Sequence, residues 1–253
     1  MRKLIVAGNW KMNTGIEEGT KLATEINAYL SKNKLPSNKK VIISPPFTHL
    51  YPISKVIDPS LIILSSQNCS YAENGAYTGE ISVKMLKELG VKNVILGHSE
   101  RRQYFKEDSE MLLKKIKMAL KYDLDITFCV GETLEQRENK KHFDIIEQEI
   151  KETLFNLNEQ EIKKIIIAYE PLWAIGTGKT ATPDQAQEMH EFIRKIIKNR
   201  FGAKISDEIS ILYGGSVKPG NAKEIFGKKD VDGGLIGGAA LKAADFIKII
   251  EAI

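Results

Sequence analysis

A carboxylate that directly follows a buried strand is the first candidate for chemistry in this chain. The apolar run 165–169 predicts that strand, and Glu170 stands at its C-terminal end. Pro171 then stops strand pairing, and a glycine-rich loop leads to residues 182–185, whose Thr, Pro and Gln are typical of a helix start. An enzyme can hold a general base beneath a movable lid in this way. An ordinary strand–loop–helix connection with an exposed glutamate fits the same residues equally well.

Two more polar residues follow apolar runs at short distance. Lys11 comes after the run 4–7, where it is either a surface residue whose stem lies along apolar side chains or a cation aimed into a site. His98 comes after the run 94–96 and a glycine that lets the backbone approach closely. A lone histidine is usually structural, but an imidazole at a strand end can also polarise a carbonyl group.

Glycine pairs follow the last two apolar runs. Gly214 and Gly215 precede Ser216, and Gly237 and Gly238 precede a predicted helix. Exposed backbone N–H groups at such turns bind dianions, and phosphate sites after strands seven and eight recur in barrels. One pair alone can mark only a turn, whereas two pairs at these positions predict a phosphate cradle. A base, an electrophile, a cation, a cradle and a lid together fit proton abstraction next to the carbonyl of a small phosphorylated substrate.

The sequence lacks the motifs of nucleotide-binding proteins, serine hydrolases and metalloenzymes. The segment 178–180 resembles the end of a nucleotide-binding P-loop, but that motif requires a glycine where Trp173 stands. No dinucleotide-binding glycine motif follows the first apolar run, no Gly-x-Ser-x-Gly elbow occurs, and no group of His, Cys, Asp and Glu has metal-ligand spacing. The sequence therefore predicts neither a cofactor nor a metal.

Short apolar runs alternate with amphipathic segments and must position these residues. Runs without polar alternation suit strands that are buried on both faces of a parallel sheet. The runs are 4–7, 41–43, 61–64, 94–96, 126–130, 165–168, 209–212 and 231–236. The pattern predicts an α/β fold, a single (β/α)8 TIM barrel over residues 1–253 with its active site at the C-terminal ends of the strands. An open doubly wound sheet is the alternative.

Apolar residues at helical spacing fill the gaps between these runs. They are Leu22, Ile26 and Leu30; Leu112, Ile116 and Ala119; Phe143, Ile146, Ile150 and Leu154; and Ala186, Met189, Ile193 and Ile196. Residues 133–136 form a second possible capping box, which marks another helix start.

The charge balance argues against a nucleic-acid partner. The chain of 253 residues has 37 basic and 33 acidic side chains, a net charge of +4, and no basic stripe. Cys69 and Cys129 follow apolar runs without redox or metal spacing, which predicts buried, reduced thiols. No stretch is long enough to span a membrane, and the first apolar run is too short for a signal peptide. We therefore expect a cytoplasmic protein that binds neither nucleic acid nor membranes.

Over essentially its whole length the chain resembles the triosephosphate isomerase family. The motifs that carry the resemblance occur in the family's order and spacing: AGNWKMN (7–13), GAYTGE (75–80), LGHSERR (96–102), CVGE (129–132), AYEPLWAIGTG (168–178), YGGSV (213–217) and GGA (237–239). The resemblance implies that dihydroxyacetone phosphate and D-glyceraldehyde 3-phosphate are interconverted through an enediolate, in glycolysis and gluconeogenesis. It also implies a homodimer that works without a cofactor.

The resemblance implies a role for each matching residue. Glu170 would be the base that moves a carbon-bound proton, and His98 the electrophile that polarises the carbonyl and shuttles protons between the two oxygens. Lys11, with Asn9, would stabilise the enediolate and the phosphate ester, and Glu100 would lie behind them. The phosphate would be bound by Gly176, Ser216, Gly237 and Gly238.

A closing lid and a dimer contact are implied in the same way. The lid and its clamp would consist of Pro171, Leu172, Trp173, Ala174, Ile175, Thr177, Gly178 and Leu235. Closure would exclude water and so strengthen the Glu170 carboxylate as a base. Thr78 would reach into the active site of a partner subunit. Ala240 replaces a serine common in the family, and Gly234 replaces a bulkier residue, which would loosen its strand.

Two alternatives belong to different functional classes. One is another phosphate-binding barrel enzyme, such as a lyase or an aldolase. A Schiff-base aldolase needs a lysine on an inner strand, and the sixth run has none after Lys164, which precedes its apolar core. The other is a non-catalytic phosphate-binding barrel, against which the presence of Glu170, His98 and Lys11 argues.

Overall fold

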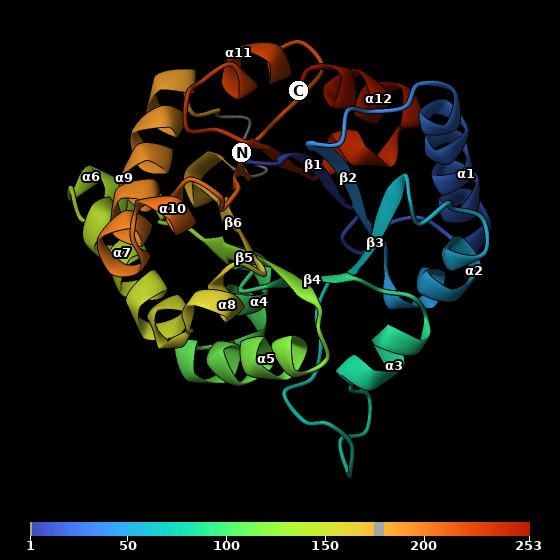
Figure 1. Cartoon of the computed structure of the whole chain (residues 1–253), viewed down its shortest axis with the longest axis horizontal. Coiled ribbons are helices and arrows are strands. Elements are labelled where there is room, and N and C mark those ends of the chain that lie inside the picture. The colour runs from blue at the N-terminus through green and yellow to red at the C-terminus, as the bar shows by residue number, and fades with distance from the viewer. Residues whose placement is uncertain (1, 175–179) are drawn as a thin grey trace.

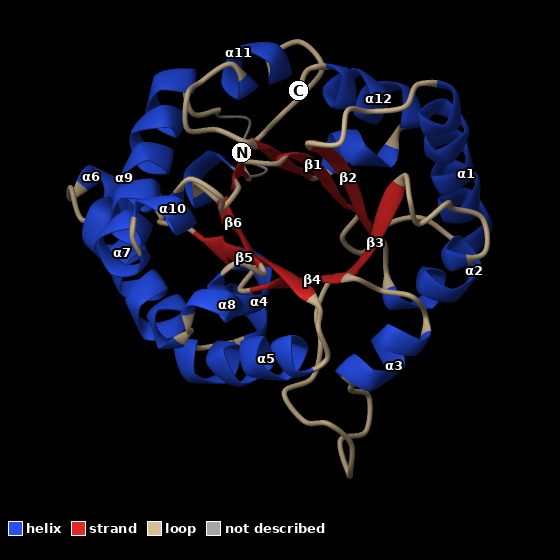
Figure 2. Cartoon of the chain, in the orientation of Figure 1, coloured by secondary structure: helices blue, strands red, loops and turns tan. Residues whose placement is uncertain are grey.

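Parallel strands close into a barrel that helices surround (Figures 1 and 2). The computed structural model describes residues 2–174 and 180–253. In this part of the chain the barrel has eight strands, which neighbour one another in chain order, and β1 pairs with both β2 and β8. This closure confirms the predicted (β/α)8 barrel and excludes the open doubly wound sheet.

The strands lie on the predicted apolar runs with small shifts at their ends. They are β1 (Leu4–Asn9), β2 (Lys39–Ser44), β3 (Ile62–Ser66), β4 (Asn93–Leu96), β5 (Asp125–Val130), β6 (Ile165–Tyr169), β7 (Ile211–Tyr213) and β8 (Gly233–Ile236). The last two begin two residues later than their runs. Gly233 has φ +122°, and a Cβ there would lie 2.0 Å from the carbonyl oxygen of Ile5, so this strand starts on a glycine for steric reasons.

Helices connect the strands on the outside of the barrel (Figure 2). They are α1 (Ile16–Lys32), α2 (Leu50–Ser54), α3 (Val83–Glu88), α4 (Ser99–Phe105), α5 (Ser109–Lys121), α6 (Leu134–Glu138), α7 (His142–Thr153), α8 (Glu159–Ile162), α9 (Pro183–Phe201), α10 (Ala203–Ser206), α11 (Ala222–Phe226) and α12 (Ala243–Glu251). Both predicted capping boxes are present: Thr133 with Gln136 starts α6, and Thr182 with Gln185 starts α9.

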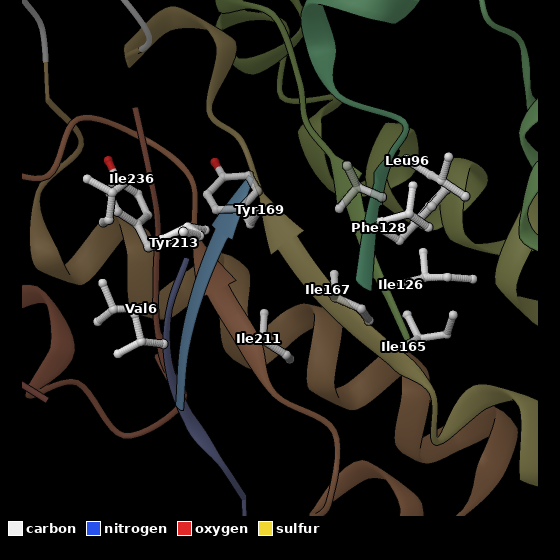
Figure 3. Packing of buried hydrophobic residues seen from close by; sticks show 14 of the residues in the cluster. Val6, Leu96, Ile126, Phe128, Ile165, Ile167, Tyr169, Ile211, Tyr213 and Ile236 are labelled. Carbon is white, nitrogen blue, oxygen red and sulfur yellow. The ribbon is translucent and has the colours of Figure 1, made fainter. Parts of the chain in front are cut away.

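The apolar core has two layers because alternate strand residues point to opposite faces. The outer layer joins strands to helices and includes Val6, Phe128, Ile167 and Tyr169, shown with their neighbours in Figure 3. The inner layer fills the barrel and consists of Ile5, Ala7, Ile42, Ile95, Cys129, Ala168, Leu212 and Leu235. Cys69 and Cys129 are buried free thiols, as predicted. The predicted helical apolar faces are buried too, except for the partly buried Phe143.

Two further features concern Gly234, which departs from the family pattern, and the segment that carries Thr78. Beside Gly234, the ring of Phe226 lies 3.1 Å from where a Cβ would stand, so a neighbouring side chain occupies that space. The segment between β3 and α3 projects away from the barrel (Figure 1), and Thr78 is exposed on it. None of the described helices is long and apolar enough to cross a membrane.

Candidate active site

A cavity of about 570 Å³ opens at the C-terminal ends of the strands. It gathers residues that were predicted from separate strand ends or from the family resemblance: Asn9, Lys11, His98, Glu100, Glu170, Ser216, Leu235, Gly237 and Gly238. Gly214, Gly215, Lys218 and Lys242 line it as well. Barrel closure therefore brings the base candidate, the imidazole, the lysine and both glycine pairs around one space.

Glu170 is held in place by backbone and side-chain contacts. Its N–H donates to the carbonyl of Val130 at 2.8 Å, which continues the β5–β6 ladder past the end of β6. Its carboxylate accepts the Ser99 N–H at 2.9 Å and lies 3.1 Å from Nε2 of His98. Only 2% of the residue is exposed, which rejects the reading of Glu170 as an exposed glutamate. The contact with the Ser99 backbone carries no side-chain signal and was not predictable from residue types.

The hydrogen bonds of His98 define its tautomer. The Glu100 N–H donates to Nδ1 at 3.3 Å, so Nδ1 is the acceptor and Nε2 carries the proton in the neutral ring. This proton points to the cavity side, where Nε2 meets Glu170 at 3.1 Å. His98 caps the N-terminus of α4, and burial leaves it 5% exposed. A neutral imidazole of this tautomer can donate a hydrogen bond to a carbonyl oxygen and take the proton back.

Lys11 is fixed in an uncommon backbone conformation. Its φ is +53°, and the strain is held by the Asn9 side chain, which accepts the Lys11 N–H at 3.0 Å, and by Gln67, which donates to the Lys11 carbonyl at 2.8 Å. The ammonium lies 2.7 Å from a carboxylate oxygen of Glu100. These contacts favour the reading of Lys11 as a cation aimed into the site rather than as a surface residue.

The opposite end of the cavity presents backbone groups and positive charge. Gly238 starts a 3-10 helix, Gly238–Leu241, and a Cβ on it would meet no described atom within 4 Å. Open backbone N–H groups of this kind suit an anion. Lys218 and Lys242 add positive charge, and both were missed because neither directly follows an apolar run; Lys242 could have been found from its place four residues after the glycine pair.

The segment after Glu170 is only partly described. Pro171 is buried, and Leu172–Ala174 form a 3-10 helix. Nε1 of Trp173 donates to the buried carboxylate of Glu132 at 2.9 Å, and the Tyr169 hydroxyl donates to the same oxygen. Ile175, Gly176, Thr177 and Gly178, which were predicted to form the lid and one phosphate contact, lie outside the described residues. Among the described residues no cluster could hold a metal ion.

Comparison with known proteins gives one consistent family. A model described as triosephosphate isomerase matches residues 4–253. The triosephosphate isomerase of Flavobacterium johnsoniae is 52% identical over 253 residues, the whole of both chains. That of Chloroherpeton thalassium is 54% identical over 251 residues, covering 99% of each chain, and that of Porphyromonas gingivalis is 52% identical over 252 residues, covering 100% of each.

Proposed function

The chain belongs to the triosephosphate isomerase family, and we propose that Glu170, His98 and Lys11 carry out its reaction. That reaction is the interconversion of dihydroxyacetone phosphate and D-glyceraldehyde 3-phosphate, a step of glycolysis that needs no cofactor. The observation that supports these roles is the arrangement of the Glu170 carboxylate, the His98 imidazole and the Lys11 ammonium around one cavity. An aldolase or a non-catalytic barrel is not favoured, since every relative compared above carries the isomerase name.

In the proposed proton transfer through an enediolate, Glu170 and His98 each move one proton away from the substrate and one proton to it. Glu170 takes a proton from the carbon next to the carbonyl. The electron pair of that C–H bond forms the C=C bond of the enediolate, and the π pair of the carbonyl moves to its oxygen. His98 donates its Nε2 proton towards this oxygen and recovers a proton from the neighbouring hydroxyl. Glu170 then returns its proton to the other carbon. Glu170 and His98 lie 3.1 Å apart, so a substrate that reaches both side chains must part them.

The other residues bind and hold the substrate. Lys11 offsets the negative charge on the enediolate and the phosphate ester, and Glu100 and Asn9 fix its position. The phosphate accepts hydrogen bonds from the backbone N–H groups of Ser216, Gly237 and Gly238, which line the cavity. Gly176, the fourth predicted donor, lies outside the described residues. Leu235 lines the same cavity as Glu170. Exclusion of water from this space strengthens the carboxylate as a base and protects the enediolate from losing its phosphate.

We further propose a single-domain protein that acts as a cytoplasmic homodimer and also serves gluconeogenesis. The loop that carries Thr78 would insert beside the active site of a partner subunit. Two exposed apolar side chains support such a contact: Tyr77, on this loop, is 44% exposed, and Met85, on α3 directly after the loop, is 55% exposed.

The test is a coupled assay with either triose phosphate, without added metal. Wild-type protein should turn over both substrates. Glu170→Asp retracts the carboxylate by one methylene and should lower kcat on the order of 100-fold or more while KM changes little. Glu135→Asp, the same change at an exposed position of α6, is the matched control and should be silent. An unchanged kcat for Glu170→Asp would refute the assignment of the base.

A further inference from the structure

A guanidinium behind the active site ties two strand ends together. Arg102, on α4, donates from Nε to the carbonyl of Gly97 at 2.8 Å and from Nη2 to the carbonyl of Cys129 at 3.1 Å. Gly97 follows β4 and Cys129 lies in β5, so a single side chain cross-links neighbouring elements of the barrel. Its orientation is further limited by the ring of Phe128, 5.7 Å away.

Glu149, on α7, completes this connection from outside the barrel. Its Oε2 accepts the Gly131 N–H at 3.1 Å, and its Oε1 lies 3.5 Å from Nη1 of Arg102. The two side chains are 18% and 19% exposed, respectively. The carboxylate therefore holds both the guanidinium and the backbone that follows β5.

Both ends of this arrangement adjoin the proposed catalytic residues. Gly97, which receives the Arg102 hydrogen bond, directly precedes His98. Gly131 lies against Glu170 so closely that a Cβ there would stand 2.0 Å from the Glu170 carbonyl oxygen. A displacement of either glycine must therefore move one of the reacting side chains.

We propose that Glu149 and Arg102 act as a pair of positioning residues that hold His98 and Glu170 in their reactive arrangement from behind the barrel. The proposal rests on the proposed function, since it assigns those two residues to catalysis. Neither Glu149 nor Arg102 lines the substrate cavity, so neither touches the substrate. Their hydrogen bonds to the backbone at Gly97, Cys129 and Gly131 connect them to His98 and Glu170.

The charge of Glu149 changes near neutral pH. Removal from water raises the pKa of Glu149 to about 7; Arg102 and the Gly131 N–H oppose this, and the nearby carboxylates of Glu170 and Glu132 add to it. Above this pH the pair is an ion pair, whereas below it Glu149 is neutral and holds Arg102 less strongly. Glu149→Gln keeps an acceptor for Gly131 and copies the neutral form at every pH.

The experiment compares kcat of wild type and Glu149→Gln across pH. The kcat of wild type divided by that of Glu149→Gln should be about three to ten at about pH 8.5, where residue 149 is charged only in the wild type. This ratio should be near one at about pH 5.5, where residue 149 is neutral in both proteins. Titration of groups that do not interact with Glu149 cancels in the ratio. KM should change little, because the substrate contacts remain. Glu147→Gln, on the same helix, removes a carboxylate paired with Lys151 and is the matched control, with a ratio near one throughout.

The outcomes separate this proposal from the proposed function. A wild type without turnover would refute the function. A working wild type whose ratio to Glu149→Gln is constant across pH would refute the positioning role, because a purely structural loss does not follow the charge of Glu149. Arg102→Lys offers a second check: one ammonium cannot bridge Gly97 and Cys129 while facing Glu149, so kcat should fall at all pH values. An unchanged kcat in this variant would also overturn the proposal.

Discussion

Gly97→Ala tests how strictly the backbone before His98 is determined. Gly97 has φ +75°, a region in which residues with a Cβ cost about 1–2 kcal/mol. A Cβ there would also stand 2.8 Å from the carbonyl oxygen of Cys129 and 3.2 Å from the ring of Phe128. Both are buried, so relief requires backbone movement and costs about 1–3 kcal/mol more. We expect a total loss of about 2–5 kcal/mol in the free energy of unfolding.

Gly90→Ala is the matched control for this measurement. Gly90 has φ +81°, but no described atom lies within 4 Å of its Cβ position, so only the conformational cost of about 1–2 kcal/mol applies. Urea unfolding of both variants and wild type gives the two losses, and the coupled assay gives kcat. Gly97→Ala should be the less stable variant and should lose activity at least tenfold, because His98 moves with the backbone. Equal losses of stability in the two variants would show that the contact with Cys129 is easily relieved and would refute the argument.

Two further predictions concern buried ionisable groups away from the cavity. Asp232 accepts hydrogen bonds from the Arg194 guanidinium at 2.7 Å and from the Ile211 N–H at 2.8 Å, so Asp232→Asn should lower the free energy of unfolding by about 2–4 kcal/mol. Glu110→Gln, which removes the exposed ion pair with Lys114, should lower it by under about 0.5 kcal/mol. Similar losses in urea unfolding of the two variants would contradict the burial argument. Burial lowers the pKa of His190 to about 3. Between about pH 3 and about pH 6.5 this histidine therefore binds a proton more readily in the unfolded chain than in the folded protein. The free energy of unfolding should fall by about 1.4 kcal/mol per pH unit as the pH drops through that window. Urea unfolding of His190→Gln should lack this part of the slope, and an unaltered slope would refute it.

Much of the fold could be predicted because its signals are local. Buried parallel strands appear as continuous apolar runs, and each run from β1 to β8 overlaps a strand of the barrel. Helix starts such as Thr182 with Gln185 depend on residues three apart, so sequence alone identifies them. The start of β8 could not be predicted in this way. The reason for its glycine lies in β1, more than two hundred residues away, where the Ile5 carbonyl leaves no room for a side chain.

The candidate site, too, was predictable from the sequence only in part. Residue types at strand ends, such as Glu170, His98 and Lys11, together with the family's motifs, were enough to name the groups that we propose as reacting groups, because the proposed chemistry requires those side chains. Which groups touch was decided only by closure of the barrel. The protonated nitrogen of His98 follows from a backbone N–H, and the support from Arg102 and Glu149 follows from carbonyl groups that every residue possesses. Backbone contacts between distant segments leave no mark on residue type, and only the tertiary structure can reveal them.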